Sequence, residues 1–447
     1  MKNDASANAS RREFVKQGSL LAGGLIASPL FSRANFFAGA DDTIKIALVG
    51  CGGRGTGAAT QALLSKQNVK LVAMADAFRD NLDRCYQSIS SEMENESAGK
   101  SVNMKTRIDV PEERKFTGFD GYKKAIALAD VVILATPPGF RPIHFEEAIA
   151  QGKHVFMEKP VATDPAGIQK VLASAAIAKE KKLNVVVGLQ RHYQNSYREL
   201  FKRKDLIGDI TSAQAWWNND GVWVRPRKYN QTEMEYQMRN WYYFVWLCGD
   251  HITEQHIHNL DVINWFKGGY PVKAQGMGGR QVRKGKDHGE IFDHHYVEFQ
   301  YADGSILNSQ CRHIPGTMSK VDELFVGTKG KIQCGAARIT DNSGKVLYQF
   351  DTKTENNPYQ TEHDELFAAI AKGEYKFADA ENGAKSTMTS ILGRFATYSG
   401  QVVEWDKAIN SGIDLHPKVY DWDVLPPIVP NADGFYPIAV PGVTKFV

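Results

Sequence analysis

The five cysteines of this 447-residue chain are too few and too scattered for a cysteine-based site. No two of them form a C-x-x-C pair, which excludes a cysteine-rich zinc site. Their odd number in so long a chain argues against a disulfide framework. A single disulfide in an oxidising compartment is the alternative that this count leaves open.

An excess of positive or negative charge is also missing from most of the chain. The formal net charge is +3, and residues 1–40 account for all of it, with five basic and two acidic side chains. Residues 41–447 hold equal numbers of basic and acidic side chains. A body with balanced charge has no electrostatic attraction for nucleic acid or for an anionic membrane surface. We therefore expect neither as a partner.

Apolar runs of membrane-spanning length are absent as well. The nearest candidate, at 18–31, is short and rich in glycine and alanine, as signal peptides are. It follows the twin-arginine pattern SRREFVK at 10–16 and precedes a small-residue cleavage pattern, Ala-Gly-Ala, at 38–40. We expect residues 1–40 to be a twin-arginine signal peptide, read by the twin-arginine export machinery. The mature chain is then periplasmic and has no membrane span.

A glycine-rich motif directly follows a β-rich apolar run at 43–49. This G-x-G-x-x-G motif comprises Gly50, Gly52, Gly53, Arg54 and Gly55. Its first glycine allows a tight turn, its second lets backbone approach a pyrophosphate, and its last lets a helix pack closely on a strand. A helical segment at 56–64 and a second strand at 69–75 follow. This order predicts a dinucleotide-binding domain.

The choice of dinucleotide depends on Asp76, which ends the second predicted strand. It lies 21 residues after Gly55, where a carboxylate can accept both ribose hydroxyls of the adenosine. A 2′-phosphate would meet the charge of Asp76, so we expect NAD. Arg79 lies close by and keeps NADP as the less favoured alternative.

Further motifs follow the strand predicted at 130–136. They are the run Ala135 to Pro138, His144, the run Gly152 to Val155, and Glu158-Lys159-Pro160. This ordered set resembles the Gfo/Idh/MocA oxidoreductase family, which includes glucose-fructose oxidoreductase and inositol dehydrogenases. The resemblance implies that Lys159 is catalytic beside the nicotinamide and that Glu158 faces the cofactor ribose. It places the remaining cofactor contacts at Thr136, Pro137, His144 and Gln190.

The residues around Lys159 agree with the role that the resemblance implies. An ammonium group at the mouth of a parallel sheet can hydrogen-bond a reacting hydroxyl or its developing oxyanion. Pro160 restricts the backbone of Lys159 to extended conformations. An isolated lysine, without these neighbouring motifs, would be interpreted as an ordinary surface residue.

The two halves of the chain predict different folds. We expect a Rossmann domain of the α/β class over 41–190, because apolar strands alternate with helical segments there. Short strand-like segments separated by glycine turns, such as 296–300 and 323–326, indicate a second, α+β domain. That domain, at 191–424, is expected to carry an open, mainly antiparallel sheet. Residues 425–447 hold five prolines and predict an extended arm, which could wrap a neighbouring subunit.

A second candidate catalytic cluster lies at 254–261. It resembles the family's Asp-x-Gly-x-His-x-x-Asp motif, which places His258 at the position of the catalytic histidine and Glu254 at the acidic position. A helix would bring these two side chains to one face, so we expect Glu254 to orient His258. His258 can then accept the proton of a carbinol hydroxyl. Asp261 is expected to be structural.

The same stretch departs from the family at His256, where a glycine is usual. This histidine could reshape the pocket or act as a second proton-transfer group. The substrate contacts that we expect are Arg191, Trp217, Arg239, Trp241 and His256. Aromatic rings can stack on a sugar, and arginines can bind its hydroxyls; core packing or a subunit interface is the alternative for each aromatic residue.

Several side chains of metal-ligand type lie in this half of the chain. They are His251, Glu254, His256, His258, Asp293, His294 and His295. The spacing H-x-x-x-x-H-x-H is not that of a zinc site, and no H-E-x-x-H motif is present, so we expect no metal. The pair His294-His295 could end a substrate-facing strand, or strand alternation could expose one of the two.

Together these observations predict an exported enzyme that transfers hydride between NAD and a secondary hydroxyl of a sugar, glycoside or cyclitol. The cofactor is expected to be tightly bound, because no soluble NAD pool exists outside the cytoplasm, and the chain is expected to form a homo-oligomer. The main alternative is a glycoside hydrolase that works by transient oxidation and elimination. A non-catalytic sugar- or cofactor-binding protein is a third class.

Overall fold

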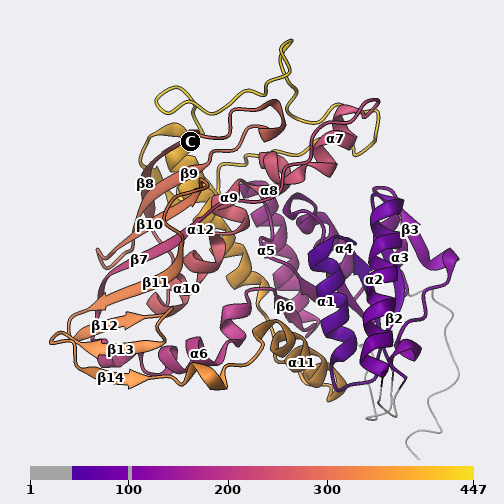
Figure 1. The fold of residues 1–447 in the computed structure, drawn as a ribbon, viewed down its shortest axis with the longest axis horizontal. Coiled ribbons are helices and arrows are strands. Elements are labelled where there is room, and N and C mark those ends of the chain that lie inside the picture. Colours follow the sequence, from indigo (N-terminus) through magenta and orange to yellow (C-terminus); the bar gives the residue numbers. More distant parts are fainter. Residues whose placement is uncertain (1–42, 99–102, 447) are drawn as a thin grey trace, which may run out of the picture. The chain divides into compact units, whose positions relative to one another are not determined.

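The computed structural model describes residues 43–98 and 103–446 (Figure 1). The predicted signal peptide at 1–40 lies outside the described residues. Two sheets organise the described chain, which is classed as α/β. One is formed by residues 44–187 and the other by residues 210–404. Within the described ranges, no helix combines the length and the apolar character needed to cross a membrane.

The first sheet has six parallel strands in the order β3-β2-β1-β4-β5-β6. The strands are β1 (Ile44–Val49), β2 (Val69–Asp76), β3 (Lys115–Thr117), β4 (Val131–Leu134), β5 (His154–Met157) and β6 (Val185–Val187). This is the Rossmann order, in which β2 and β3 are added on one side of β1 and β4 to β6 on the other. Ligands of such sheets bind beyond the carboxyl ends of the strands, where the strand order reverses between β1 and β4.

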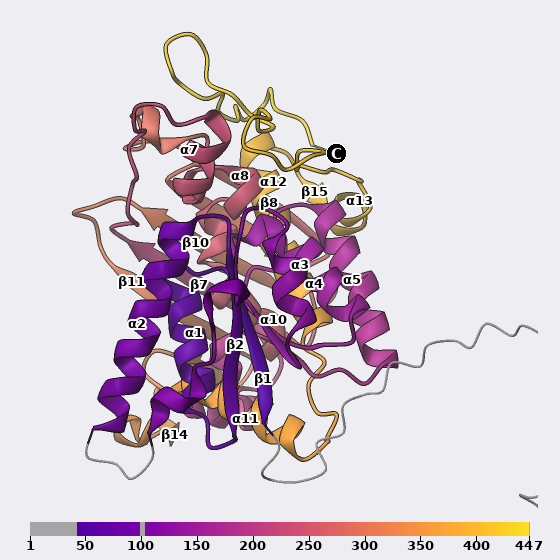
Figure 2. The same ribbon diagram turned by 90° about the vertical axis from the view of Figure 1, so that its right-hand side faces the viewer.

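Helices cover both faces of this sheet, which explains why its strands are continuous apolar runs. They are α1 (Gly53–Leu64), α2 (Arg79–Ser97), α3 (Gly121–Ala127), α4 (Arg141–Ala150) and α5 (Pro165–Glu180). Figure 2 shows α1 and α2 on one side of β1 and β2, with α3, α4 and α5 on the other. The polar stretch between α2 and β3 holds two short 3-10 turns, at 104–107 and 112–114.

The second sheet has nine strands in the order β14-β13-β12-β11-β7-β10-β9-β8-β15. The strands are β7 (Ile210–Asn219), β8 (Lys273–Gly279), β9 (His294–Gln300), β10 (Ile306–His313), β11 (Lys320–Gly327), β12 (Gly330–Gln333), β13 (Arg338–Asp341), β14 (Val346–Gln349) and β15 (Val403–Glu404). All neighbours are antiparallel except β7 and β10. The predicted open, mainly antiparallel sheet is confirmed.

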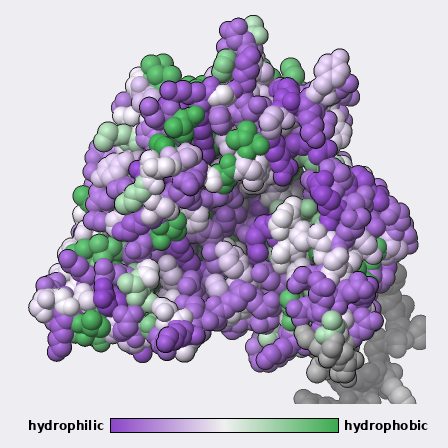
Figure 3. Space-filling view, in the orientation of Figure 1, coloured by the Kyte–Doolittle hydropathy of each residue, from purple (hydrophilic) through white to green (hydrophobic). Residues whose placement is uncertain are grey.

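Helices cover one face of the second sheet. Burial alternates along β9 and β10. Helix α12 (Ala380–Ser399) packs on β8 and β9, and α10 (Ile257–Lys267) packs on β7 and β11 (Figure 1). The opposite face is not covered by a helix of the described chain. In Figure 3 the hydrophobic side chains form scattered groups on the face shown rather than one continuous area.

The C-terminal helices return to pack on the Rossmann domain. Helix α12 packs on α5 as well as on β8, and α11 (Pro358–Ala371) packs on α1. A side chain at Gly393 would come within 2.8 Å of the Phe299 ring, so this glycine is needed for close packing. The largest buried apolar cluster therefore contains residues from both sheets.

The chain after α13 (Trp405–Ile409) runs without helices or strands to residue 446. Its aromatic side chains pack on the same chain: Tyr436 contacts Phe244 at 4.9 Å between ring centroids, and Phe446 stacks on Phe395 at 4.4 Å. The described part of the arm contains no helix or strand, as expected for an extended segment. That the arm wraps a neighbouring subunit stays a prediction.

Candidate active site

The glycine-rich turn joins β1 to α1, next to the place between β1 and β4 where the strand order of the first sheet reverses. Gly50 has a φ of +98°, and a Cβ there would lie 2.4 Å from the backbone nitrogen of Thr136. A Cβ on Gly55 would lie 2.0 Å from the Gly50 carbonyl oxygen, so only glycine permits this helix–strand approach. Both observations agree with the roles expected from the motif.

The start of α1 is built to receive an anion. A Cβ added at Gly52 or Gly53 would have no atom within 4 Å other than those of the neighbouring residues. Gly52 caps the helix without a side-chain hydrogen bond, and the first turn has no acidic residue. The first backbone N–H groups therefore face an open space at the positive end of the helix dipole. A dinucleotide pyrophosphate fits this arrangement.

A cavity of about 350 Å³ lies beside this turn. The predicted cofactor residues that line it are Gly50, Gly52, Gly53, Arg54, Asp76, Thr136, Pro137 and His144. Gly55 instead packs behind the turn. Gln190 lies near a second cavity, described below, where its side-chain amide donates to the Tyr359 hydroxyl at 3.2 Å.

Asp76 lies at the carboxyl end of β2, where the sequence places a ribose-binding acid. Its carboxylate accepts hydrogen bonds from the backbone N–H groups of Cys51 at 2.7 Å and Phe78 at 2.8 Å. Burial raises the pKa of Asp76 above its usual value, and these hydrogen bonds oppose that shift. The side chain remains partly exposed toward the cavity.

His144 contributes a neutral imidazole to the same cavity. Its Nδ1 lies 3.2 Å from the hydroxyl of Thr136. Burial, and then the neighbouring Arg141 cation, lower the pKa of His144 to about 3. The histidine therefore carries no charge at neutral pH and acts as a hydrogen-bonding group.

A second cavity, of about 270 Å³, lies next to the first and shares lining residues with it. The shared residues are Arg54, Ala135, Thr136 and Trp241. The three predicted catalytic residues Lys159, Glu254 and His258 all line this second cavity, together with Glu158, Trp217 and Trp241. The fold thus gathers residues from β5, β7, α9 (His251–Glu254) and α10 at one place.

Lys159 and Glu254 form a pair in this cavity. The Lys159 Nζ donates to the Glu254 backbone carbonyl at 2.6 Å and to its Oε1 at 3.2 Å. Both side chains are largely buried, at 13% and 14% exposed. Two of the three ammonium hydrogens are therefore engaged, and one is left for another acceptor. The peptide bond between Lys159 and Pro160 is cis.

The expectation that Glu254 orients His258 is wrong. Within the described chain Glu254 makes no hydrogen bond with His258, and its carboxylate binds Lys159 instead. The physical reason is a break in the helix, because α9 ends at Glu254 and α10 begins at Ile257. Two residues one turn apart share a face only if the helix between them is continuous.

His258 is held by stacking rather than by a carboxylate. The Trp217 ring lies 5.8 Å from it, centroid to centroid, at an interplanar angle of 24°. The Trp217 Nε1 donates to the Gln255 Oε1 at 2.7 Å, which positions the indole. Burial lowers the pKa of His258 well below its usual value, and the cations Lys159 and Arg191 lower it further. The imidazole is therefore neutral and able to accept a proton.

Arg54 and Glu158 stand where the two cavities meet. The Arg54 Nε donates to the Glu158 Oε1 at 2.5 Å, and its guanidinium lies 4.9 Å from the centre of the Tyr359 ring. Glu362 lies behind this pair, with its Oε1 3.6 Å from the Arg54 Nη2, and burial raises the pKa of its carboxyl well above the usual value. Tyr359 and Gln255 were missed by the sequence reasoning. Tyr359 comes from α11, 200 residues after Lys159, and no local pattern signals its position.

Three of the predicted substrate contacts are corrected by the structure. Arg191 forms an ion pair with buried Glu323, and it does not line the second cavity. His256 is fully buried, with its Nε2 2.7 Å from the Ser309 hydroxyl. Arg239 lines the cofactor cavity rather than the second one. Each was predicted from its side-chain chemistry, whereas tertiary partners decide which groups reach a cavity.

The other polar residues singled out by the sequence have structural surroundings. Asp261, the last residue of the motif, accepts from His192 at 2.7 Å and from the Ser386 hydroxyl at 2.8 Å, as a structural residue does. His294 is 43% exposed whereas His295 is buried, so strand alternation separates the two histidines.

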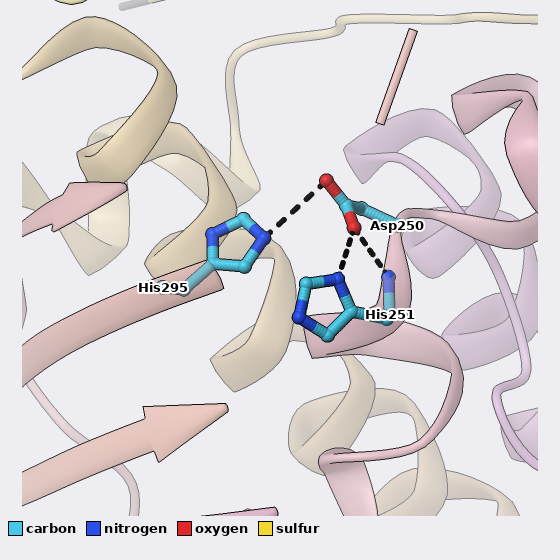
Figure 4. A group of neighbouring side chains, drawn as sticks. All are labelled: Asp250, His251 and His295. Carbon is cyan, nitrogen blue, oxygen red and sulfur yellow. Dashed lines mark hydrogen bonds and ion pairs between the residues drawn. The ribbon is translucent and has the colours of Figure 1, made fainter. Parts of the chain in front are cut away.

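Asp250, His251 and His295 form a buried cluster that has the side chains of a metal site (Figure 4). The Asp250 Oδ1 accepts from the His251 backbone at 2.5 Å and from its Nδ1 at 2.8 Å, and the Oδ2 lies 3.3 Å from the His295 Nε2. The Oδ2 also accepts from the Tyr398 hydroxyl. The Arg283 Nη1 lies 3.4 Å from the His251 Nδ1. Donors and a neighbouring cation favour a hydrogen-bonded cluster over a bound metal.

The Rossmann sheet is matched by a protein-family model. Residues 44–189 match the Gfo/Idh/MocA model, which describes an oxidoreductase family with an NAD-binding Rossmann fold. Over this domain the match confirms the predicted resemblance, and the NAD-binding fold that the model describes agrees with the predicted cofactor.

Two curated relatives match a longer part of the chain. An inositol 2-dehydrogenase of Gluconacetobacter diazotrophicus is 28% identical over 55% of this chain and 61% of its own length. A 2,7-anhydro-N-acetylneuraminate hydratase of Escherichia coli is 25% identical over 55% of this chain and 64% of its own length. The matched region thus spans less than two thirds of either relative.

Solved structures share the fold of the described chain. A scyllo-inositol dehydrogenase of Lactobacillus casei, with bound NAD(H) and scyllo-inositol, aligns with a TM-score of 0.60 at 19% identity. The alignment covers 82% of this chain and all of that one. An aldose-aldose oxidoreductase of Caulobacter crescentus aligns with a TM-score of 0.62 at 16% identity, over 81% of this chain and all of that one.

Proposed function

We propose that this chain is an NAD-dependent oxidoreductase acting on a secondary hydroxyl of a cyclitol or sugar. The observation that carries the proposal is the position of Lys159 and His258, which line one cavity directly next to the cavity beside the glycine-rich turn. The named inositol dehydrogenase among the relatives supports this class of substrate. When bound, the nicotinamide accepts or returns the hydride.

The chain's own residues manage the proton and the charge on the reacting oxygen. Neutral His258 accepts the proton of the hydroxyl as its carbon is oxidised, and returns it in the reverse direction. The free N–H of the Lys159 ammonium donates to the same oxygen and stabilises its developing negative charge. The role of Glu254 is to hold that ammonium in place through its carbonyl and carboxylate.

The walls of the second cavity suit a polyhydroxylated ring. Trp217 and Trp241 supply flat apolar surface, and Gln255 and Tyr359 supply polar groups beside it. A ring with C–H groups on its faces and hydroxyls around its edge matches both kinds of surface. We assign Trp217 and Trp241, but not Arg191, Arg239 or His256, to substrate binding.

The experiment is a substrate panel read in two channels. The purified protein is incubated with NAD and with inositol isomers, aldoses or aryl glycosides, while reduced nicotinamide and released aglycone are recorded together. The proposal requires reduced nicotinamide to accumulate with at least one cyclitol or sugar and no aglycone to appear. Aglycone release without lasting reduction would instead establish the glycosidase that works by transient oxidation.

We propose further that the chain is exported by the twin-arginine route and works in the periplasm with its NAD tightly held. The arginine pair at 11–12 supports the route. A double Arg11→Lys, Arg12→Lys variant, expressed beside the wild type, tests it by cell fractionation. The wild type should appear in the periplasmic fraction and the variant should not; equal export of both would refute the proposal.

A homo-oligomer formed through the second sheet is the last part of the proposal. On the face away from α10 and α12, Met277 is 70% exposed and Ile306 is 40% exposed. Apolar side chains on an uncovered sheet face are typical of an interface. Sedimentation of the wild type and of a Met277→Glu, Ile306→Glu variant should show a dimer or larger assembly only for the wild type. A monomeric wild type would contradict this part alone.

A further inference from the structure

The cofactor cavity has a wall that does not come from the Rossmann sheet. Residues 220–241 follow β7 of the second sheet, and we call them the cover segment. It places five side chains in the lining that also contains Gly52 and Asp76; they are Trp223, Arg225, Met238, Arg239 and Trp241. A dinucleotide in this cavity would therefore be enclosed between the glycine-rich turn and the cover segment.

An ion pair and a cation–π contact attach the cover segment to the Rossmann domain. The Arg239 guanidinium lies 3.3 Å from both carboxylate oxygens of Asp80, in the first turn of α2. The same guanidinium lies 3.9 Å from the centre of the Phe78 ring. The Arg239 Nε also donates to Glu235 within the cover segment at 2.8 Å, which holds the side chain in this orientation.

Two aromatic residues between α13 and the C-terminal arm support the Rossmann side of the cavity. Phe78, Phe119 and Phe140 line the cavity. Trp422 lies 5.1 Å from the Phe78 ring and 4.5 Å from the Phe119 ring, and Tyr420 lies 5.1 Å from the Phe140 ring, each between centroids. Trp422 and Tyr420 thus keep these rings in position from outside.

Arg225 differs from the other two arginines of the cavity. Arg54 is paired with Glu158 and Arg239 with Asp80, whereas Arg225 forms no ion pair with a carboxylate of the described chain. Its Nη1 donates to the Arg239 carbonyl at 3.3 Å. Its guanidinium lies 4.5 Å from the centre of the Trp223 ring.

The surroundings of Arg225 favour an anionic ligand. Its backbone N–H is fixed by the Asn240 side chain at 2.9 Å, so the residue is held in place before any ligand arrives. Partial burial lowers the pKa of Arg225, the cations Arg84 and Arg239 lower it further, and Asp80 opposes the shift. A phosphate group at this place would accept from a guanidinium that no carboxylate of the described chain pairs with.

We propose that the cover segment closes over the bound dinucleotide, that Arg225 binds one of its phosphate groups, and that the Arg239–Asp80 pair keeps the segment closed. The proposal rests on the NAD site of the proposed function and deepens it. Exchange of the cofactor then requires the segment to open, so the cofactor stays bound through many turnovers.

The closing pair is tested with Asp80→Asn, which removes the partner of Arg239 but lies outside the cavity lining. Asp83→Asn is the matched control, because Asp83 lies on the same helix, pairs with Arg79 and does not line the cavity. Stopped-flow measurements with NADH fluorescence give association and dissociation rates without any substrate. Asp80→Asn should raise both rates several-fold and by a similar factor, since entry and exit both require opening. Asp83→Asn should leave both rates close to those of the wild type.

The phosphate contact is tested with Arg225→Ala. Loss of a charge-assisted hydrogen bond should raise the dissociation rate and the Kd for NADH roughly ten- to a hundredfold. Lys228→Ala, an exposed cation in the same segment, is the control and should change neither. Equal weakening of NADH and NADPH assigns Arg225 to the pyrophosphate, and weakening of NADPH alone assigns it to a 2′-phosphate.

Two results would overturn the proposal: NADH exchange that is unchanged in both Asp80→Asn and Arg225→Ala, or a wild type that releases NADH as fast as Asp80→Asn. Thermal unfolding of each variant confirms that it is folded. These readouts need no turnover, so a protein that retains NADH as described but oxidises no sugar would contradict only the proposed function. A protein that oxidises sugars but exchanges NADH freely would contradict only the cover segment.

Discussion

Lys159 and Glu254 are 95 residues apart in the sequence, and they are joined by two hydrogen bonds in the candidate active site. The backbone carbonyl of Glu254 makes the shorter contact, so part of the pairing does not depend on the carboxylate. The ammonium is therefore positioned by the chain path at the end of α9 as well as by a charge.

This pair predicts different effects for two substitutions of Glu254. Glu254→Gln keeps an acceptor oxygen and the backbone contact, so kcat should fall by less than about tenfold. Glu254→Ala leaves one acceptor and lets the Lys159 ammonium move, so kcat should fall further while KM changes little. Steady-state kinetics on the substrate found by the panel measure both. A larger loss in the Gln variant than in the Ala variant would contradict a positioning role.

Removal of the proton-handling groups should have the largest effect on rate. Lys159→Ala and His258→Ala should each lower kcat by about 10²- to 10⁴-fold, because each acts on the reacting oxygen. His294→Ala is the matched control, since His294 is an exposed histidine of the second sheet and does not line either cavity. Single-turnover measurements with NAD already bound separate chemistry from cofactor release. Unchanged rates in both variants would instead favour the non-catalytic binding protein.

The buried state of His258 sets an expectation for the pH profile. Its pKa is lowered by burial and by Lys159 and Arg191, so the base form persists below the ordinary histidine range. The rate of substrate oxidation should therefore remain near its maximum at pH 6.5 and decline only at lower pH. The profile of kcat against pH, recorded beside that of the His294→Ala control, measures this limb. A half-maximal rate at or above pH 6.5 would show that His258 titrates as a solvent-exposed histidine.

The buried His256 predicts a pH-dependent contribution to stability. Burial lowers the pKa of His256 to about 3, whereas an unfolded chain would hold it near 6.5. Between these values the unfolded state binds a proton that the folded state does not, so stability falls as pH falls below about 6.5. The His256→Asn variant should lose this component, about 1.4 kcal/mol per pH unit in that range. Urea unfolding of both proteins at pH 7, 6 and 5 measures the two slopes, and equal slopes would contradict the expectation.

The close approach of Gly55 and Gly50 predicts a strong effect of one methyl group. Gly55→Ala would bring a Cβ to 2.0 Å from the Gly50 carbonyl, so the turn that faces the cofactor must shift. We expect the free energy of unfolding to fall by about 1–3 kcal/mol, as it does for an overpacked core, and NADH to bind more weakly. Gly269→Ala is the control, because no atom lies within 4 Å of its added Cβ and its φ is not positive. Thermal unfolding and NADH titration measure both effects.

Features encoded by neighbouring residues could be read from the sequence. Alternating apolar strands and helices, the glycines at 50–55 and the acid 21 residues later predict the Rossmann sheet, because each feature acts within one strand–turn–helix unit. Short strand-like segments separated by glycine turns predicted that the second sheet is mainly antiparallel. Its strand order, with β7 parallel to β10, depends on pairing between distant segments and carries no local signal.

The partners of the site residues were decided by the tertiary structure. Glu254 binds Lys159 rather than His258, because Gln255 interrupts the helix and the sheet of the other domain lies within reach. Arg239 reaches the cofactor cavity and Arg191 a buried carboxylate, although both looked equally suited to a sugar. The chemistry of each side chain follows from the sequence. The packing of segments that lie far apart in the sequence decides which of these side chains face a cavity.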